Sequence, residues 1–157
     1  MSQGQESLEG SVSVRDTRVR DAMTAPVISV ATLADIEEAL NLMIDNKISG
    51  LPVLDTDGRL AGVLTEYDVL WFFRESKSAY HPFEPCQEFM SRAMITIASD
   101  ASLDEASDIL VKTSVRRLLV VDNDELVGVL SRRDVVRFIR DERVAQSHLP
   151  WTPTEDC

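Results

Sequence analysis

Two four-residue stretches of the chain place a hydroxyl three residues before a carboxylate. They are TEYD at 65–68 and SRRD at 131–134, and each stands directly ahead of an apolar pattern with helical spacing. A hydroxyl and an acid at this spacing cap the N-terminus of a helix, because both accept hydrogen bonds from free amide groups of the first turn. The same rim suits a nucleotide, since the carboxylate can accept the ribose hydroxyls while the amides and the hydroxyl bind phosphate. From these residues alone, capping and ligand binding both stay open.

Basic side chains set the second stretch apart from the first. The second half carries arginines around it at Arg116, Arg117, Arg132 and Arg133. The corresponding residues of the first half are Ser49, Gly50, Glu66 and Tyr67. Because guanidinium groups pair with phosphate oxygens in a fork geometry, this cluster in an acidic chain indicates a phosphate site. The alternative is that the arginines pair with acidic side chains on a solvated face.

The two stretches belong to two copies of one longer unit. Residues 50–70 read GLPVLDTDGRLAGVLTEYDVL, and residues 116–136 read RRLLVVDNDELVGVLSRRDVV. Matches before the turn lie 67 residues apart, and a one-residue deletion in the turn reduces the spacing to 66 after it. Matches this dense indicate a duplication. We predict a disordered tail, a first repeat, a linker, a second repeat and a C-terminal tail, with bounds 1–17, 18–76, 77–84, 85–143 and 144–157.

Each copy is predicted to form a strand, a helix, two strands and a helix. Short apolar runs at 27–30 and 94–97 predict the first strands. The helices that follow are expected to begin at capping boxes, at 35–38 and 102–105. Paired apolar runs around the DTDG and DND turns predict hairpins, and a final helix follows each hydroxyl–acid stretch. The pattern is β-α-β-β-α, written twice.

The composition excludes several classes of protein. With a formal net charge of −11 and a pI of about 4.5, the chain repels DNA, RNA and anionic lipid. No apolar run is long enough to span a bilayer and the first residues lack the features of a signal peptide, so we expect a cytoplasmic protein. Two cysteines and two histidines, His81 and His148, form no metal-ligand or nucleophile pattern. We therefore expect no catalytic activity and no required cofactor.

The repeated pattern G-hydrophobic-P-V…D…G…L-x-G-V-L-[ST]-x-x-D resembles that of a tandem pair of CBS domains, also known as a Bateman module. The resemblance covers residues 18–143. It implies an α/β fold in which two β-α-β-β-α repeats pack their sheets about a pseudo-two-fold axis and leave two clefts. Such clefts commonly bind AMP, ADP, ATP, S-adenosylmethionine or dinucleotides, so the resemblance implies an adenosine nucleotide or a related adenosyl compound as the ligand.

The resemblance also implies roles for individual residues. In the family, the aspartate of this motif holds the ribose, which carries over to Asp68 and Asp134, beside the hydroxyls of Thr65 and Ser131. The first choices for the phosphate are Arg117 and Arg133, ahead of Arg116 and Arg132. We expect the second-half cleft to be the better phosphate site, because the first half has an acid at the matching helix start. An arginine of one half serving the ligand of the other half is the alternative arrangement.

Adenine recognition is expected to rest on apolar residues around the strand starts. They are Val27, Ile28, Ile48, Leu51 and Pro52 in the first half and Met94, Ile95, Val115 and Leu118 in the second. The core needs apolar residues at these positions in any case, so none is specific taken singly. Leu119 stands where the family pattern has the equivalent of Pro52, which leaves the second-half backbone less constrained.

The function indicated is a regulatory, ligand-sensing module that acts on a separate effector protein. The alternative is a dimeric scaffold with vestigial clefts. The helices expected at 36–46 and 103–113 carry more apolar residues than one core-facing stripe needs, which predicts a homodimer joined through them. The alternative is that the second-half sheet and the linker cover this surplus.

Overall fold

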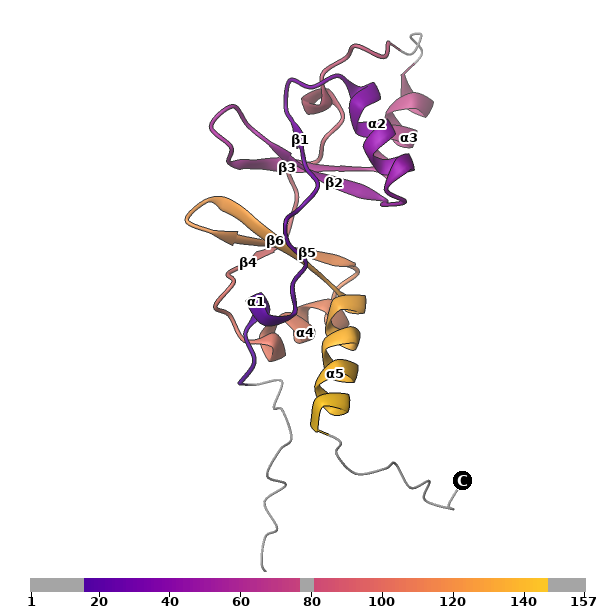
Figure 1. The fold of residues 1–157 in the computed structure, drawn as a ribbon. Coiled ribbons are helices and arrows are strands. Elements are labelled where there is room, and N and C mark those ends of the chain that lie inside the picture. Colours follow the sequence, from indigo (N-terminus) through magenta and orange to yellow (C-terminus); the bar gives the residue numbers. More distant parts are fainter. Residues whose placement is uncertain (1–15, 77–80, 147–157) are drawn as a thin grey trace, which may run out of the picture.

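A computed structural model describes residues 16–76 and 81–146. Two three-stranded sheets face each other across the middle of the molecule, and the helices lie on their outer sides (Figure 1). This is the α/β arrangement of two β-α-β-β-α repeats about a pseudo-two-fold axis that the sequence predicts. The predicted tails lie outside the described residues apart from Asp16, Thr17 and the end of the last helix. Within the described residues, no helix is both long and apolar enough to cross a membrane.

The first half begins its sheet with a strand shorter than predicted. Its elements are β1 (Val30–Ala31), α2 (Ile36–Asp45), β2 (Gly50–Leu54), β3 (Leu60–Thr65) and α3 (Glu66–Glu75). β1 pairs in parallel with β2, and β2 forms an antiparallel hairpin with β3. Residues 27–29, predicted as strand, do not pair, and two of them line the cavity described below.

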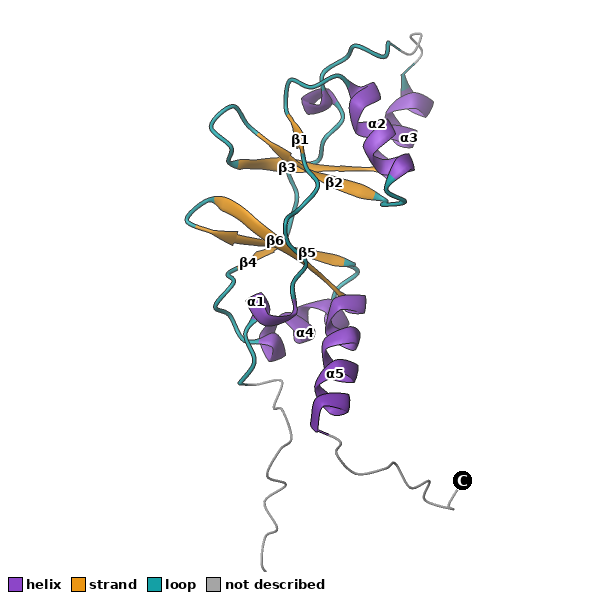
Figure 2. Ribbon diagram, in the orientation of Figure 1, coloured by secondary structure: helices purple, strands orange, loops and turns teal. Residues whose placement is uncertain are grey.

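The second half repeats this order. Its elements are β4 (Thr96–Ile97), α4 (Leu103–Lys112), β5 (Arg117–Asp122), β6 (Glu125–Ser131) and α5 (Arg132–Gln146). β4 runs parallel to β5, which pairs antiparallel with β6 (Figure 2). A short helix precedes each half, α1 (Val19–Ala22) in the first and the 3-10 helix η1 (Cys86–Glu88) in the second.

One of the two predicted capping boxes is wrong and the other is half formed. The hydroxyl of Ser102 accepts the amide of Glu105, as expected, at 3.1 Å. The side chain of Asp35 makes no capping bond to α2. The first two amides of α2 instead donate to main-chain carbonyls of residues 82 and 84, so the connection between the halves satisfies that helix end.

Each half is completed by the segment that leads into the other half. The α1 segment donates from Val19 to the carbonyl of Ala101 at 2.9 Å and packs on α4 and α5. Thr24 then exchanges two main-chain hydrogen bonds with Val129 on β6. The segment before β4 does the same on the opposite side, where Ser91 exchanges two bonds with Val63 on β3. The two leading segments are therefore crossed between the halves.

The hydrophobic cores follow this crossing. Val19 is fully buried among second-half residues such as Leu103, Leu118 and Leu130. Cys86 and Phe89, which lead into the second half, are buried in the first-half core with Ile36, Leu51 and Leu64. Each core therefore depends on apolar side chains donated by the leading segment of the other repeat.

Glycines mark the places where the crossed segments touch the sheets. A Cβ on Gly62 would lie 2.7 Å from the main-chain oxygen of Ser91. One on Gly128 would meet the flexible side chain of Met23 and would lie 3.2 Å from the main-chain oxygen of Thr24. We expect Gly62→Ala to destabilise the fold by about 1–3 kcal/mol, because a backbone atom must move. Gly128→Ala is the repeat-equivalent control and should cost less, since a methionine side chain can shift. Urea unfolding measures both, and equal costs would contradict this account.

Burial also sets the chemistry of Cys86. Desolvation, aided by Glu38 and Asp35, raises the pKa of its thiol from 9.0 to about 11. A raised pKa means that the thiol supports stability fully below pH 9 and that this support is lost as the pH rises towards 11. In a Cys157→Ser background, we expect the free energy of unfolding to fall by about 2–3 kcal/mol more over this range than in Cys86→Ala. Parallel pH profiles for the two proteins would contradict the burial effect.

Candidate functional site

A cavity of about 1000 Å³ lies between the two halves, where the strands end and α3 and α5 begin. Both hydroxyl–acid pairs reach it, and so do most of the residues selected from the sequence. Its lining includes Val27, Ile28, Ile48, Leu51, Pro52, Thr65, Asp68, Met94, Ile95, Val115, Arg116, Arg117, Ser131 and Asp134. Residues chosen from two separate repeats thus surround one space.

Three of the selected residues lie elsewhere, and their positions correct the sequence-based prediction. Arg132 folds back over α4, where its guanidinium donates to the carbonyls of Leu110 and Thr113 at 3.0 and 3.3 Å. Arg133 is exposed on α5 and does not line the cavity. Leu118 is fully buried in the second-half core, because its side chain points to the helix side of β5. Arg116 and Arg117 therefore remain as the residues predicted to bind a phosphate.

The first hydroxyl–acid pair forms a closed cap at the start of α3. Asp68 Oδ2 accepts the amide of Thr65 at 2.9 Å and its hydroxyl at 2.7 Å. The amide of Asp68 donates back to the hydroxyl oxygen of Thr65 at 3.2 Å. Thr65 and Asp68 therefore cap α3, and the cap uses one of the two carboxylate oxygens of Asp68.

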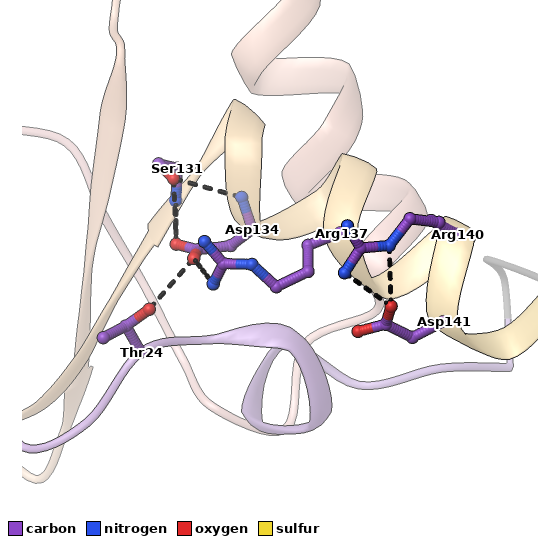
Figure 3. Close-up of polar contacts among 6 residues, drawn as sticks. All are labelled: Thr24, Ser131, Asp134, Arg137, Arg140 and Asp141. Atoms are coloured by element: carbon purple, nitrogen blue, oxygen red, sulfur yellow. Dashed lines mark hydrogen bonds and ion pairs between the residues drawn. The ribbon is translucent and has the colours of Figure 1, made fainter.

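The second pair forms the same cap at the start of α5 and adds two further contacts (Figure 3). Asp134 Oδ2 accepts the amide and the hydroxyl of Ser131 at 2.8 and 2.9 Å. Asp134 Oδ1 accepts the hydroxyl of Thr24 at 2.9 Å and faces the Arg137 guanidinium at 3.4 Å. Farther along α5, Arg140 pairs with Asp141 on the surface at 2.8 Å. Asp134 thus ties the crossed leading segment to the helix start, with only 7% of its surface exposed.

The first half lacks both of these extra contacts. Ser91 is the repeat equivalent of Thr24, but its hydroxyl accepts the amide of Ala93 at 3.2 Å. Trp71 stands at the position equivalent to Arg137. Among the described residues, no side chain donates to Asp68 Oδ1, whereas Asp134 Oδ1 already has partners. The two carboxylates share a motif but differ in what remains available to a ligand.

Comparison with known proteins agrees with the geometry. A family model for the CBS domain matches residues 19–75 and again residues 86–141. The chain belongs to the CBS-domain family. The resemblance drawn from the repeated motif is confirmed, and the described residues form a CBS pair.

Relatives of this CBS pair include proteins whose ligands are visible in crystals. It is 33% identical over 128 residues to the chloroplastic CBS domain-containing protein CBSX1 of Arabidopsis thaliana, aligning 65% of this chain with 54% of that protein. It matches CBSX2 of the same plant in complex with AMP, with 30% identity, a TM-score of 0.71, and coverage of 80% of this chain and 98% of the other. It also matches the CBS pair of MJ0100 bound to 5-methylthioadenosine and S-adenosyl-L-methionine, with 26% identity, a TM-score of 0.66, and 80% and 98% coverage. The chain spans about half the length of CBSX1.

Charge is distributed unevenly around the cavity of this CBS pair. Among the described lining residues, the basic side chains are Arg116 and Arg117, both exposed at the start of β5. The acids are Asp68, Asp134 and Glu66, the last at the first turn of α3. An anionic group in the cavity is therefore favoured on the β5 side. The described residues contain no cluster of three or more acidic, histidine or cysteine side chains that could hold a metal ion.

The sequence reasoning missed several lining residues of the CBS pair. Thr24 and Ser91 line the cavity from the crossed segments, and Tyr67 lines it from the first turn of α3. Thr24 and Ser91 are both hydroxyl residues 67 positions apart, directly after the matched Met23 and Met90. That repeat match was a usable signal. Their crossing to the opposite half could not be read from it.

Proposed function

We propose that this CBS pair is a cytoplasmic, non-catalytic sensor that binds an adenosine nucleotide or a related adenosyl compound and regulates a separate effector protein. The observation that carries the proposal is the shared cavity, where two helix-capping carboxylates stand near two exposed arginines. Carboxylates can accept hydrogen bonds from ribose hydroxyls, and arginines can pair with phosphate. The lining therefore offers partners for both the ribose and the phosphate of a nucleotide. The AMP and S-adenosylmethionine complexes of relatives support the same ligand class.

A thermal-shift and calorimetry screen tests ligand binding. AMP, ADP, ATP, S-adenosylmethionine and 5-methylthioadenosine form the panel, with GMP and inorganic phosphate as controls. A ligand that binds only the folded state adds RT ln(1 + [L]/Kd), or about 2.7 kcal/mol at a hundred times Kd. We expect at least one adenosine compound to raise the melting temperature above both controls. No shift across the panel at millimolar concentration would favour the scaffold alternative.

We also propose that the protein forms a homodimer, although the apolar surplus is not placed as predicted. In α2, Ile36, Ala39 and Met43 are buried in the core, and Ile44 stays exposed. In α4, Leu110 is buried and Val111 is exposed. The larger uncovered surface lies on α3, which exposes large apolar side chains along its length. A patch of this kind supports association with another chain. Light scattering of the protein measures its oligomeric state.

A further inference from the structure

The accepting positions of the Asp134 carboxylate are filled by the protein itself. An ionised carboxylate can accept about four hydrogen bonds through its two oxygens. Oδ2 already accepts the amide and the hydroxyl of Ser131. Oδ1 accepts the hydroxyl of Thr24 and faces the guanidinium of Arg137, and Figure 3 shows both side chains reaching it. A ligand at Asp134 therefore meets a carboxylate whose hydrogen bonds are already made.

Asp68 is open where Asp134 is filled. Among the described residues, both donors to Asp68 belong to Thr65, and both use Oδ2. Asp68 is also partly exposed, and it lines the cavity. The free Oδ1 can accept the neighbouring hydroxyls of a ribose without any hydrogen bond of the fold being broken. At Asp134 the same ribose would replace bonds that the fold already makes, so little free energy would be gained.

The main chain holds the Thr24 hydroxyl in its place beside Asp134. The amide of Thr24 donates to the carbonyl of Val129 at 2.8 Å, and the amide of Val129 donates back at 3.0 Å. This antiparallel bridge fixes the leading segment against β6. A ligand would have to rotate the threonine side chain away before it could reach Oδ1.

The volume of the cavity does not limit it to one ligand. At about 1000 Å³, the cavity is at the upper end of the range of roughly 300–1000 Å³ that is usual for small-molecule pockets. Both motif carboxylates line it, but among the described lining residues the basic side chains are Arg116 and Arg117, both at the start of β5. Polar groups rather than space therefore decide how many nucleotides fit.

We propose that this CBS pair binds one adenosine nucleotide per chain, and that Thr24 and Arg137 close the second ribose position. The ribose binds Asp68, and the phosphate binds the β5 arginines of the other half, so the nucleotide spans the two repeats. Thr24 and Arg137 are positioning residues, because they act on the ligand through Asp134 and set the number of molecules bound. This inference rests on the proposed function.

A count of bound ligand in a variant with the second position opened tests the proposal. Thr24→Val nearly keeps the shape of the side chain but removes its hydroxyl, and Arg137→Leu removes the other donor to Oδ1. Equilibrium dialysis with labelled AMP and labelled adenosine gives the number bound per chain. We expect one of either ligand for the parent protein and two adenosines for the double variant. Adenosine is the decisive ligand, because two uncharged molecules do not compete for the same arginines.

Two further variants serve as controls for this count. Arg140→Leu removes the same charge farther along α5, where the side chain pairs with Asp141 and does not line the cavity. Thr24→Ser retains a hydroxyl donor. Both should bind one adenosine per chain. A parent protein that binds two, or a folded double variant that still binds one, would overturn the proposal.

Removal of the first carboxylate shows whether the new site is Asp134. In the parent background, Asp68→Asn should weaken adenosine binding by about tenfold, because the open ribose position is lost. In the double variant, the same change should leave one adenosine bound at Asp134. Equal losses in the two backgrounds would contradict the closed second position. If the double variant does not fold, Arg137→Leu alone gives the comparison, since its side chain is 52% exposed.

The parent protein separates failure of this inference from failure of the proposed function. Two nucleotides bound per chain would overturn single occupancy and leave the sensor proposal in place. No binding of any adenosine compound would overturn both.

Discussion

An Arg117→Ala variant should bind AMP about ten to a hundred times more weakly than the parent protein, with its adenosine affinity almost unchanged. Arg116 and Arg117 are the basic residues of the described cavity lining, and the phosphate of AMP needs local positive charge in a protein of net charge −11. A charge-assisted hydrogen bond contributes about 1.5–3 kcal/mol, and every 1.4 kcal/mol changes affinity tenfold. Adenosine lacks the phosphate, so the loss of the arginine should not change its affinity.

The matched control for this prediction is Arg133→Ala. Arg133 lies within the second motif and was a first choice from the sequence, but it does not line the cavity. We expect its affinity for AMP to stay within about twofold of the parent protein, as for a distant surface charge screened by salt. Calorimetry at a fixed salt concentration compares the three proteins. If Arg133→Ala lost AMP binding while Arg117→Ala retained it, the assignment of the phosphate to the β5 side would be wrong.

Changing the two motif carboxylates to amides should have different consequences. Asp68→Asn should weaken AMP and adenosine alike by about tenfold or more, because the open Oδ1 of Asp68 can accept ribose hydroxyls common to both. Its stability should change little, since an asparagine oxygen can still accept the amide and hydroxyl of Thr65. If Asp68→Asn and the parent protein had equal affinities for both compounds, Asp68 would only cap α3 and would not bind the ribose.

Asp134→Asn should instead lower the free energy of unfolding by about 1.5–3 kcal/mol, the range for hydrogen bonds to a charged group. Its carboxylate holds Ser131, Thr24 and Arg137 together, and an amide nitrogen would face a guanidinium. Denaturant unfolding of the ligand-free proteins gives the comparison.

The hairpins and the four longer helices of this fold were accessible from sequence because each one is encoded locally. The hairpins follow from apolar runs around a turn, and the caps at 65–68 and 131–134 form with the partners that their spacing predicts. The position of adenine was not accessible, since the apolar residues expected around it are equally required by the core.

The misplaced residues share a different cause. Arg132 and Arg133 adjoin the motif in sequence, but adjacency in sequence does not place a side chain in the cavity. The Arg132 guanidinium instead donates to carbonyls at the end of α4, although its repeat equivalent Glu66 lines the cavity. One partner of Asp134 Oδ1 is the hydroxyl of Thr24, which is 110 residues away in the sequence. No local pattern connects these two residues, and so the difference between the two carboxylates needed the structure.

The crossed leading segments mean that the two repeats are not separate folding units. A fragment containing only the second repeat would lack Val19, and one containing only the first would lack Cys86 and Phe89, so each would leave a hole in its core. The arrangement corresponds to a domain-swapped dimer whose two subunits have been joined into one chain. Unfolding should therefore be a single cooperative transition, and two halves cut in the connection should recover the fold only when mixed. A ligand that tightens the cavity would then stabilise the whole molecule rather than one repeat.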